Sequence, residues 1–202
     1  VGLKKNRKLV PTRWSITATD DIIGKYLINE IKDFPQINSH FAFFGNYLGN
    51  HYLILMFPEV WSYELFETYV PQNWNFSKPL RYSTDYESYS GRKEYAFGTV
   101  GGYYTVRLGI LEKLKQMKRQ ASVLALRFIT DEYTMPLGVW VTREATRKSV
   151  SGKSIEFSSK ELMLEYARKL IKKRFSYNVD YLLKESILFK SIKQQKKLMQ
   201  FI

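Results

Sequence analysis

Three carboxylate pairs are the groups in this 202-residue chain with the most recognisable chemistry. Asp85 and Glu87 stand two residues apart, Asp20 and Asp21 are adjacent, and the adjacent Asp131 and Glu132 follow an apolar segment. Carboxylates bind Mg²⁺ or Mn²⁺, and a metal that keeps some of its waters can hydrolyse a phosphodiester. Solvated loop acids, and a helix cap at Asp20 or Asp21, are the alternatives. The metal is left unassigned, and the candidate catalytic residues are Asp20, Asp21, Asp85, Glu87 and Asp131.

Basic residues supply the complementary chemistry for a phosphate. Arg13 stands among threonine and serine hydroxyls, which suits bidentate phosphate binding, although an ion pair with Asp20 or Asp21 explains it equally well. Backbone N–H groups at 98–102 could hold a phosphate at a helix start, or the glycines there could form a turn only. The candidate phosphate- and DNA-binding residues are Arg13, Arg107, Lys113, Lys118, Arg119, Lys172 and Lys173.

A tyrosine-rich stretch at 74–95 alternates aromatic and basic residues. Such a pattern is typical of a stacking platform for single strands, and it also fits aromatics that cover a core. The residues concerned are Trp74, Phe76, Tyr82, Tyr86, Tyr89 and Tyr95, with Lys78, Arg81, Arg92 and Lys93.

The composition excludes several classes of protein. Cysteine is absent and only two histidines occur, so neither disulfides nor a zinc site are expected. Since the chain is 45% hydrophobic, it should fold, and no apolar run approaches the roughly 18 residues of a membrane span. Without a recognisable signal peptide, the chain is expected to be intracellular. The net charge of +13 favours a polyanionic partner, and residues 160–202 contribute +7 of it.

Hydrophobic periodicity predicts an α/β protein with a mixed β-sheet, packed helices and a helical C-terminal region. A basic arm at 1–8, one domain at 9–189 and a basic tail at 190–202 are expected. The predicted strands are 9–19, 40–48, 51–57, 121–129 and 135–141. The predicted helices are 20–35, 58–69, 101–117, 142–150, a helix from 158, and 180–188.

The last eight residues have the spacing of a peptide that binds a sliding clamp. Gln195 is followed at three-residue steps by Leu198 and Phe201, and Ile202 ends the chain. One helical turn would gather the three apolar side chains on one face, while Gln195 could fill a polar pocket. At the last position of this motif an aromatic residue is usual, and this chain has Ile202 there instead. The alternative is a helix end packed on the core.

Several longer strings resemble the archaeal Nre family of DNA-repair proteins. They are KLVPTRWSITA at 8–18, GGYY at 101–104 with Arg107, RQASVL at 119–124 and PLGVW at 136–140. The resemblance implies a role in DNA-damage repair through the sliding clamp PCNA, in the archaeal cytoplasm. It also implies a longer parent protein whose N-terminal half often carries zinc, so that this chain is expected to be the C-terminal half.

Three functions follow from these observations. The first is a DNA-repair factor that binds DNA and is recruited by the clamp. The second is a Mg²⁺- or Mn²⁺-dependent nuclease, for which no known enzyme motif is present. The third is a non-catalytic clamp adaptor. Salt-dependent DNA binding separates the adaptor from the other two, and metal-dependent cleavage separates the nuclease from the repair factor.

Overall fold

The computed structural model of the chain describes residues 12–74, 80–134 and 137–194. Six strands form one sheet in the order β4-β3-β5-β2-β1-β6, in which only β3 and β5 are parallel neighbours. The strands are β1 His40–Tyr47, β2 Asn50–Phe57, β3 Ser62–Val70, β4 Tyr82–Glu87, β5 Ser122–Thr130 and β6 Ile155–Phe157. The predicted mixed sheet is confirmed.

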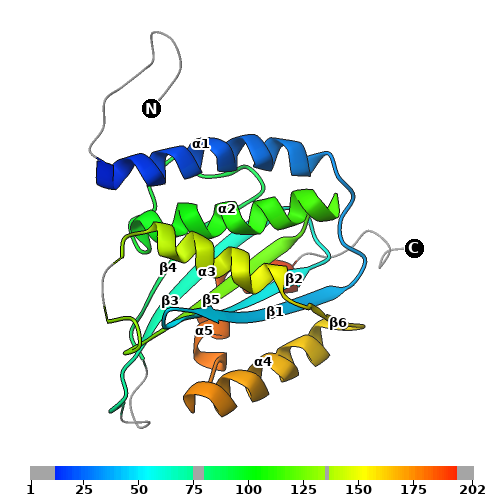
Figure 1. Cartoon of the computed structure of the whole chain (residues 1–202). Helices are drawn as coiled ribbons and strands as arrows, with labels where there is room; N and C mark the ends of the chain where they lie inside the picture. The colour runs from blue at the N-terminus through cyan, green and yellow to red at the C-terminus, as the bar shows by residue number, and fades with distance from the viewer. Residues whose placement is uncertain (1–11, 75–79, 135–136, 195–202) are drawn as a thin grey trace.

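Helices cover both faces of this sheet (Figure 1). Along one face lie α2 and α3, and α1 packs on the outer side of α2, while α4, α5 and α6 cover the opposite face. The helices are α1 Thr12–Lys32, α2 Val100–Met117, α3 Trp140–Ser151, α4 Lys160–Phe175, α5 Asp180–Glu185 and α6 Ile187–Gln194.

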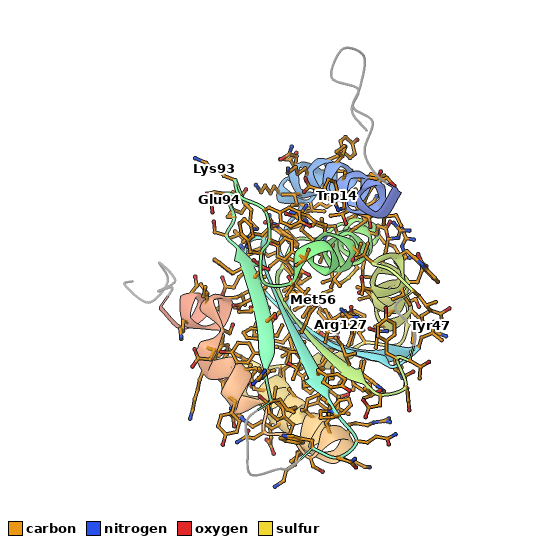
Figure 2. All side chains as sticks on the ribbon, turned by 90° about the vertical axis from the view of Figure 1, so that its left-hand side faces the viewer. Trp14, Tyr47, Met56, Lys93, Glu94 and Arg127 are labelled. Carbon is orange, nitrogen blue, oxygen red and sulfur yellow. The ribbon has the colours of Figure 1, made fainter. Side chains whose placement is uncertain are left out.

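Strand β2 shows why the sheet needs two covers. Tyr52, Ile54 and Met56 face α2. On the other side of the strand Leu53, Leu55 and Phe57 face α4, and all six side chains are fully buried. Side chains alternate between the faces of a strand, so a strand with apolar side chains on both faces has to be covered on both sides. Figure 2 shows Met56 inside this core, between the sheet and the helices.

The predicted hairpin between β1 and β2 is confirmed, with its turn at Leu48-Gly49 rather than Gly49-Asn50. Both turn residues have positive φ, 49° and 71°, as a two-residue turn between twisted strands requires. A Cβ at Gly49 would lie 2.4 Å from the backbone nitrogen of Tyr133, so a side chain is also excluded by space.

Three predicted elements are wrong. Residues 12–19 are helical rather than a strand, and they extend α1 to 21 residues. Proline is favoured at the first position of a helix, and the strand prediction gave too little weight to the Pro11 that precedes Thr12 in the sequence. Residues 62–69 form β3 instead of a helix, because β4 and β5 pair with it on both sides. In the described part of 135–141, a loop leads into α3 where a strand was predicted.

Candidate functional site

Three predicted site residues meet at the arginine cluster, which we define as Asp21, Glu87 and Arg107. The Arg107 side chain is 2% exposed and donates from Nη1 to Glu87 Oε2 at 2.8 Å and from Nη2 to Asp21 Oδ1 at 2.6 Å. Trp61 Nε1 donates to the second oxygen of Glu87 at 3.2 Å. Helices α1 and α2 and strand β4 therefore each contribute one charge to the cluster.

Arg107, which the sequence suggested as a phosphate- or DNA-binding residue, lies inside the protein. Burial alone would lower the pKa of Arg107, but Glu87, Tyr103 and Asp21 outweigh it and raise the pKa. The guanidinium therefore stays charged inside the protein. Two carboxylates occupy the guanidinium, and its exposure of 2% leaves little of it open to a ligand.

Asp85, two residues before Glu87 on the same side of β4, is also buried. It accepts hydrogen bonds at Oδ2 from the Thr99 N–H at 2.6 Å and the Thr99 hydroxyl at 2.9 Å. Arg92 lies 3.1 Å from its other oxygen. The start of α2, which the sequence suggested as a phosphate site, is thus already served by a carboxylate of the protein itself.

Asp20 and Asp21 lie in the middle of α1, so neither caps a helix as predicted. Asp20 is 1% exposed and accepts a hydrogen bond from Arg143 Nη1 on α3 at 2.6 Å. Burial raises the pKa of Asp20, and the attraction of Arg143 opposes that increase. The two neighbouring acids therefore hold α1 to different helices.

No group of three or more acidic, histidine or cysteine side chains that could hold a metal occurs among the residues the structure describes. Each of the five predicted catalytic acids accepts a hydrogen bond from an N–H or O–H group of the protein. Mg²⁺ can bind to one or two carboxylates that leave it several waters, so the metal site stays a prediction. Four of these acids also pair with an arginine, and Asp131 accepts hydrogen bonds only.

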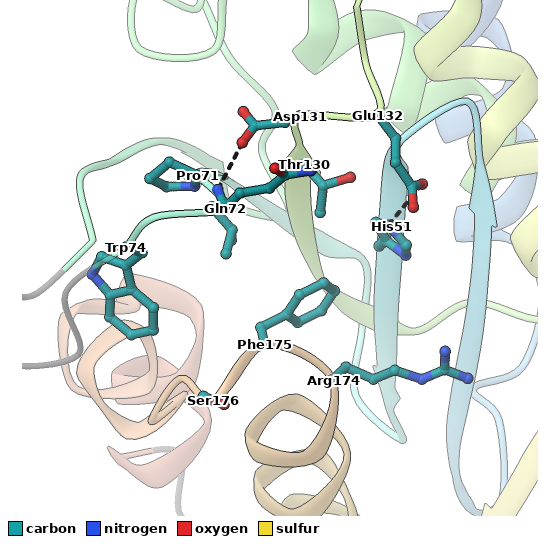
Figure 3. A pocket seen from close by; sticks show the side chains of 11 residues that line it. His51, Pro71, Gln72, Trp74, Thr130, Asp131, Glu132, Arg174, Phe175 and Ser176 are labelled. Carbon is teal, nitrogen blue, oxygen red and sulfur yellow. Dashed lines mark hydrogen bonds and ion pairs between the residues drawn. The ribbon is translucent and has the colours of Figure 1, made fainter.

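A separate pocket of about 450 Å³ opens where β3 and β5 end (Figure 3). Asp131, the fifth predicted acid, lies at its edge and accepts hydrogen bonds from the Tyr69 hydroxyl and from the Gln72 N–H, the latter at 2.6 Å. These two donors lower the pKa of Asp131. Its visible role is to fix the loop after β3 to the end of β5.

His51 forms the buried wall of this pocket, and the sequence analysis did not select it. It is 8% exposed, and neither ring nitrogen has a hydrogen-bond partner among the described residues. Burial lowers the pKa of His51, Glu132 at 4.0 Å raises it, and Arg174 lowers it further. A mostly neutral imidazole here can donate or accept one hydrogen bond with a polar ligand. Its position between a turn and an apolar strand was the only signal in the sequence.

The structure does not gather the predicted DNA-binding residues into one patch. Lys118 and Arg119 are exposed just after α2, and Lys113 lies half-buried over the Phe43 ring. Lys172 and Lys173 are exposed in the last turn of α4, on the opposite face of the sheet (Figure 1). The side chain of Arg13 lies outside the described residues, as do the clamp-binding candidates Gln195, Leu198, Phe201 and Ile202.

The predicted aromatic platform also separates into two groups. Trp74 packs against Tyr177 at 5.6 Å and Tyr82 against Phe66 at 5.4 Å, on the side of the sheet covered by α4 to α6. Tyr95 instead contacts Tyr104 of α2 at 5.3 Å. Phe76 and Lys78 lie outside the described residues. A single stacking surface made of all six aromatics is therefore not formed.

No helix in the described ranges is both long and apolar enough to cross a bilayer. No solved structure matches the chain. Residues 87–201 match the family model "Archaeal Nre, C-terminal", and residues 1–75 match "Archaeal Nre, N-terminal". The expectation that this chain holds the C-terminal half alone is therefore corrected, because residues 1–75 are similar to the N-terminal model.

Curated relatives agree with both models. The chain is 37% identical to DNA repair protein NreB of Archaeoglobus fulgidus over 197 residues, which are 96% of this chain and 48% of that protein. It is 37% identical to DNA repair protein NreA of Haloferax volcanii, over 75% of this chain and 37% of the relative. The chain thus spans less than half the length of these relatives. On the strength of these matches, it belongs to the archaeal Nre family.

Proposed function

We propose that this chain acts in DNA repair by binding DNA and by docking on the sliding clamp PCNA through residues 195–202. The observation that carries the proposal is the spacing of Gln195, Leu198, Phe201 and Ile202 in a chain whose relatives are named DNA repair proteins. Burial of three bulky apolar side chains would stabilise the complex by about 5 kcal/mol or more before ordering costs.

The helix before this segment is fixed to the domain by a buried acid. Glu64 of β3 accepts hydrogen bonds from the Ser186 hydroxyl at 2.5 Å and from the backbone N–H groups of Ile187 and Leu188 at 3.0 and 3.1 Å. A carboxylate at the start of α6 satisfies donors that the helix itself leaves open. A clamp bound to residues 195–202 would therefore be tethered within a few residues of the folded domain.

Lys172 and Lys173 offer the best supported contact for DNA. Both are exposed, they adjoin Arg174, and neither has an ion-pair partner among the described residues. Three successive cations at a helix end suit the phosphate backbone, and each phosphate contact gives a salt-dependent gain through counterion release. Lys118 and Arg119 form a second exposed pair, at the end of α2.

The clamp contact is tested by calorimetric titration of the chain against an archaeal clamp. We expect micromolar or tighter binding that Phe201→Ala abolishes. Met199→Ala is the matched control, because position 199 is free in the motif and its change should leave the affinity intact. If the unaltered chain does not bind, clamp docking is disproved.

DNA binding is tested separately, by fluorescence anisotropy at several salt concentrations. The double change Lys172→Ala with Lys173→Ala should weaken binding to all sequences and reduce the slope of log K against log salt by about 2. The double change Lys118→Ala with Arg119→Ala is the comparison at the second pair. If the unaltered chain binds no DNA but binds the clamp, it is the non-catalytic adaptor.

A further inference from the structure

Two adjoining pockets lie along α1, away from the pocket of His51. The first, the aromatic pocket, has a volume of about 550 Å³ and is walled mainly by Trp14, Tyr95, Val100 and Tyr104. The second, the basic pocket, has about 240 Å³ and includes Lys25, Lys32, Ser90 and Arg92. Asp21 lines the first pocket and Arg107 the second, so the two pockets meet at the Asp21–Arg107 ion pair.

Large apolar side chains gather around the aromatic pocket although they are exposed. Trp14 is 57% exposed, Tyr95 45% and Val100 52%, and nearby Phe97 is 76% exposed. Figure 2 shows Trp14 on α1, in the outermost helix layer. A contiguous exposed apolar area around a concave site marks a surface that binds something.

The floor of the aromatic pocket is fixed in place. The Tyr104 hydroxyl accepts a hydrogen bond from the Ala96 N–H at 3.0 Å, and the Tyr104 ring contacts that of Tyr95 at 5.3 Å. The aromatic surface is therefore formed before any ligand arrives, and little order has to be gained on binding.

Val100 adds a strained backbone at the wall. Its φ is +48°, which a β-branched residue rarely adopts. The preceding Thr99 is held by Asp85, and a Cβ at the following Gly101 would lie 2.8 Å from Val139, so the chain is fixed on both sides of Val100. Strain of this kind persists where the surroundings enforce it, and it gathers at ligand sites.

The basic pocket continues the same groove toward the end of α1. Lys25 lies one helical turn beyond Asp21, and Lys32 lies about 10 Å further along the axis. Lys32 also lies over the Tyr89 ring, at 4.5 Å. Three of the four basic groups in the basic pocket are already paired: Lys25 with Asp21, Arg92 with Asp85, and Arg107 with both Asp21 and Glu87. Among the described residues Lys32 has no acidic partner, so it is the cation that remains for an anion. An anion could therefore be held beside an aromatic surface.

We propose that the aromatic pocket takes an unstacked base of single-stranded DNA and that the basic pocket takes a phosphate of the same strand. Every base offers a flat face to Trp14 and Tyr95, while the hydroxyl of Thr17, which also lines the pocket, can bond to its edge. Bases within a duplex remain stacked and cannot enter such a pocket. The inference rests on the DNA binding proposed above, and it specifies the form of DNA and the place where it binds.

The test compares a labelled 20-nucleotide oligothymidine with a duplex of the same length, using the full chain and fluorescence anisotropy. Trp14→Ala and Tyr95→Ala should each weaken single-strand binding by about tenfold, since base stacking on an aromatic contributes that much. Duplex affinity should stay unchanged. Tyr181→Ala is the matched control, because Tyr181 is 53% exposed on α5, across the sheet. Trp14→Phe should keep most of the affinity.

Lys32→Ala should reduce the salt slope for the single strand by about 1. If Trp14→Ala and Tyr95→Ala bind the oligothymidine as the unaltered chain does, the inference is overturned, whereas DNA binding through Lys172 and Lys173 stands. If Trp14→Ala instead converts a dimer to a monomer by light scattering with DNA affinity intact, the pocket is a protein interface. If the unaltered chain binds neither the oligothymidine nor the duplex, this inference and the DNA binding proposed above both fail.

Discussion

The arginine cluster and the pocket of His51 use similar residue types in opposite ways. In the cluster, Arg107 faces the carboxylates of Glu87 and Asp21 within hydrogen-bond distance. In the pocket, the nitrogens of His51 have no such partner among the described residues, and the nearest acid, Glu132, is 4.0 Å away and largely exposed. The cluster balances its charges with its own side chains and leaves only Arg107 Nε without a partner among the described residues, whereas His51 keeps both ring nitrogens for a ligand.

This difference shows that a polar or charged residue can bind a ligand only if the protein itself does not already occupy its hydrogen-bonding groups. A buried ion pair is stable as a unit, because removal of one member leaves an uncompensated charge in a medium that solvates it poorly. The acids of the cluster therefore hold α1, α2 and β4 together. An unsatisfied buried polar group costs stability, so its presence at a pocket wall suggests a purpose other than packing.

The substitution Arg107→Met tests this comparison with the largest expected effect on stability. It leaves Glu87, which is fully buried, without its counter-charge, so we expect the free energy of unfolding to fall by about 3–5 kcal/mol. Urea unfolding followed by circular dichroism measures it. Lys115→Ala on the same helix is the control, since the Lys115–Glu30 pair is largely exposed and its loss should change little. Equal effects of the two substitutions would show that the cluster is not a buried unit.

A smaller effect is expected at the neighbouring acid of β4. Asp85→Ala removes the acceptor of both Thr99 donors at the start of α2, which should cost about 1–2 kcal/mol, the usual value of a helix cap. Asp85→Asn keeps one acceptor oxygen and should cost less. Glu94→Ala, on an exposed residue of the following loop, is the matched control in the same unfolding experiment. A loss of stability at Asp85 no larger than that at Glu94 would remove the capping role.

Much of the fold follows from local patterns in the sequence. β2 and β5 are apolar at nearly every position and are bounded by turns, and the stripe of α2 places Tyr103, Val106 and Ile110 in the core as periodicity predicts. β3 could not be identified in this way. Its alternation is interrupted by Glu64, a buried acid whose partners lie 122 to 124 residues away on α6. Local propensity has no information about such a partner.

The candidate sites were less predictable for the same reason. The sequence makes Arg107 a phosphate- or DNA-binding candidate because a charged residue usually lies in solvent. Its burial is made possible by Asp21 and Glu87, which are 86 and 20 residues away. Trp14 lies in a segment predicted to be a strand, so its place beside Tyr95 could not be foreseen. Sequence identified many of the chemical groups, whereas their pairing depended on tertiary contacts.

The smallest effect is expected at His51, whose pocket is the region compared with the arginine cluster, and it concerns how stability depends on pH. Because burial lowers its pKa below the ordinary 6.5, the unfolded chain binds a proton here more readily than the folded one. The contribution of a neutral His51 is therefore fully present above pH 6.5 and is lost as the pH falls from there through the folded-state pKa. Asp20 and Glu64 have raised pKa values and act with the opposite sign in acid, so only a comparison with His51→Gln isolates the histidine.

We expect the unaltered chain to lose slightly more stability than His51→Gln between pH 7 and pH 5, in thermal unfolding scans. Nuclear magnetic resonance gives the direct value, since the ring signal absent from His51→Gln should titrate below pH 6.5. A titration at or above that value would mean that Glu132 outweighs both burial and Arg174. His51 would then be a charged member of an ion pair, and the pocket would resemble the arginine cluster rather than contrast with it.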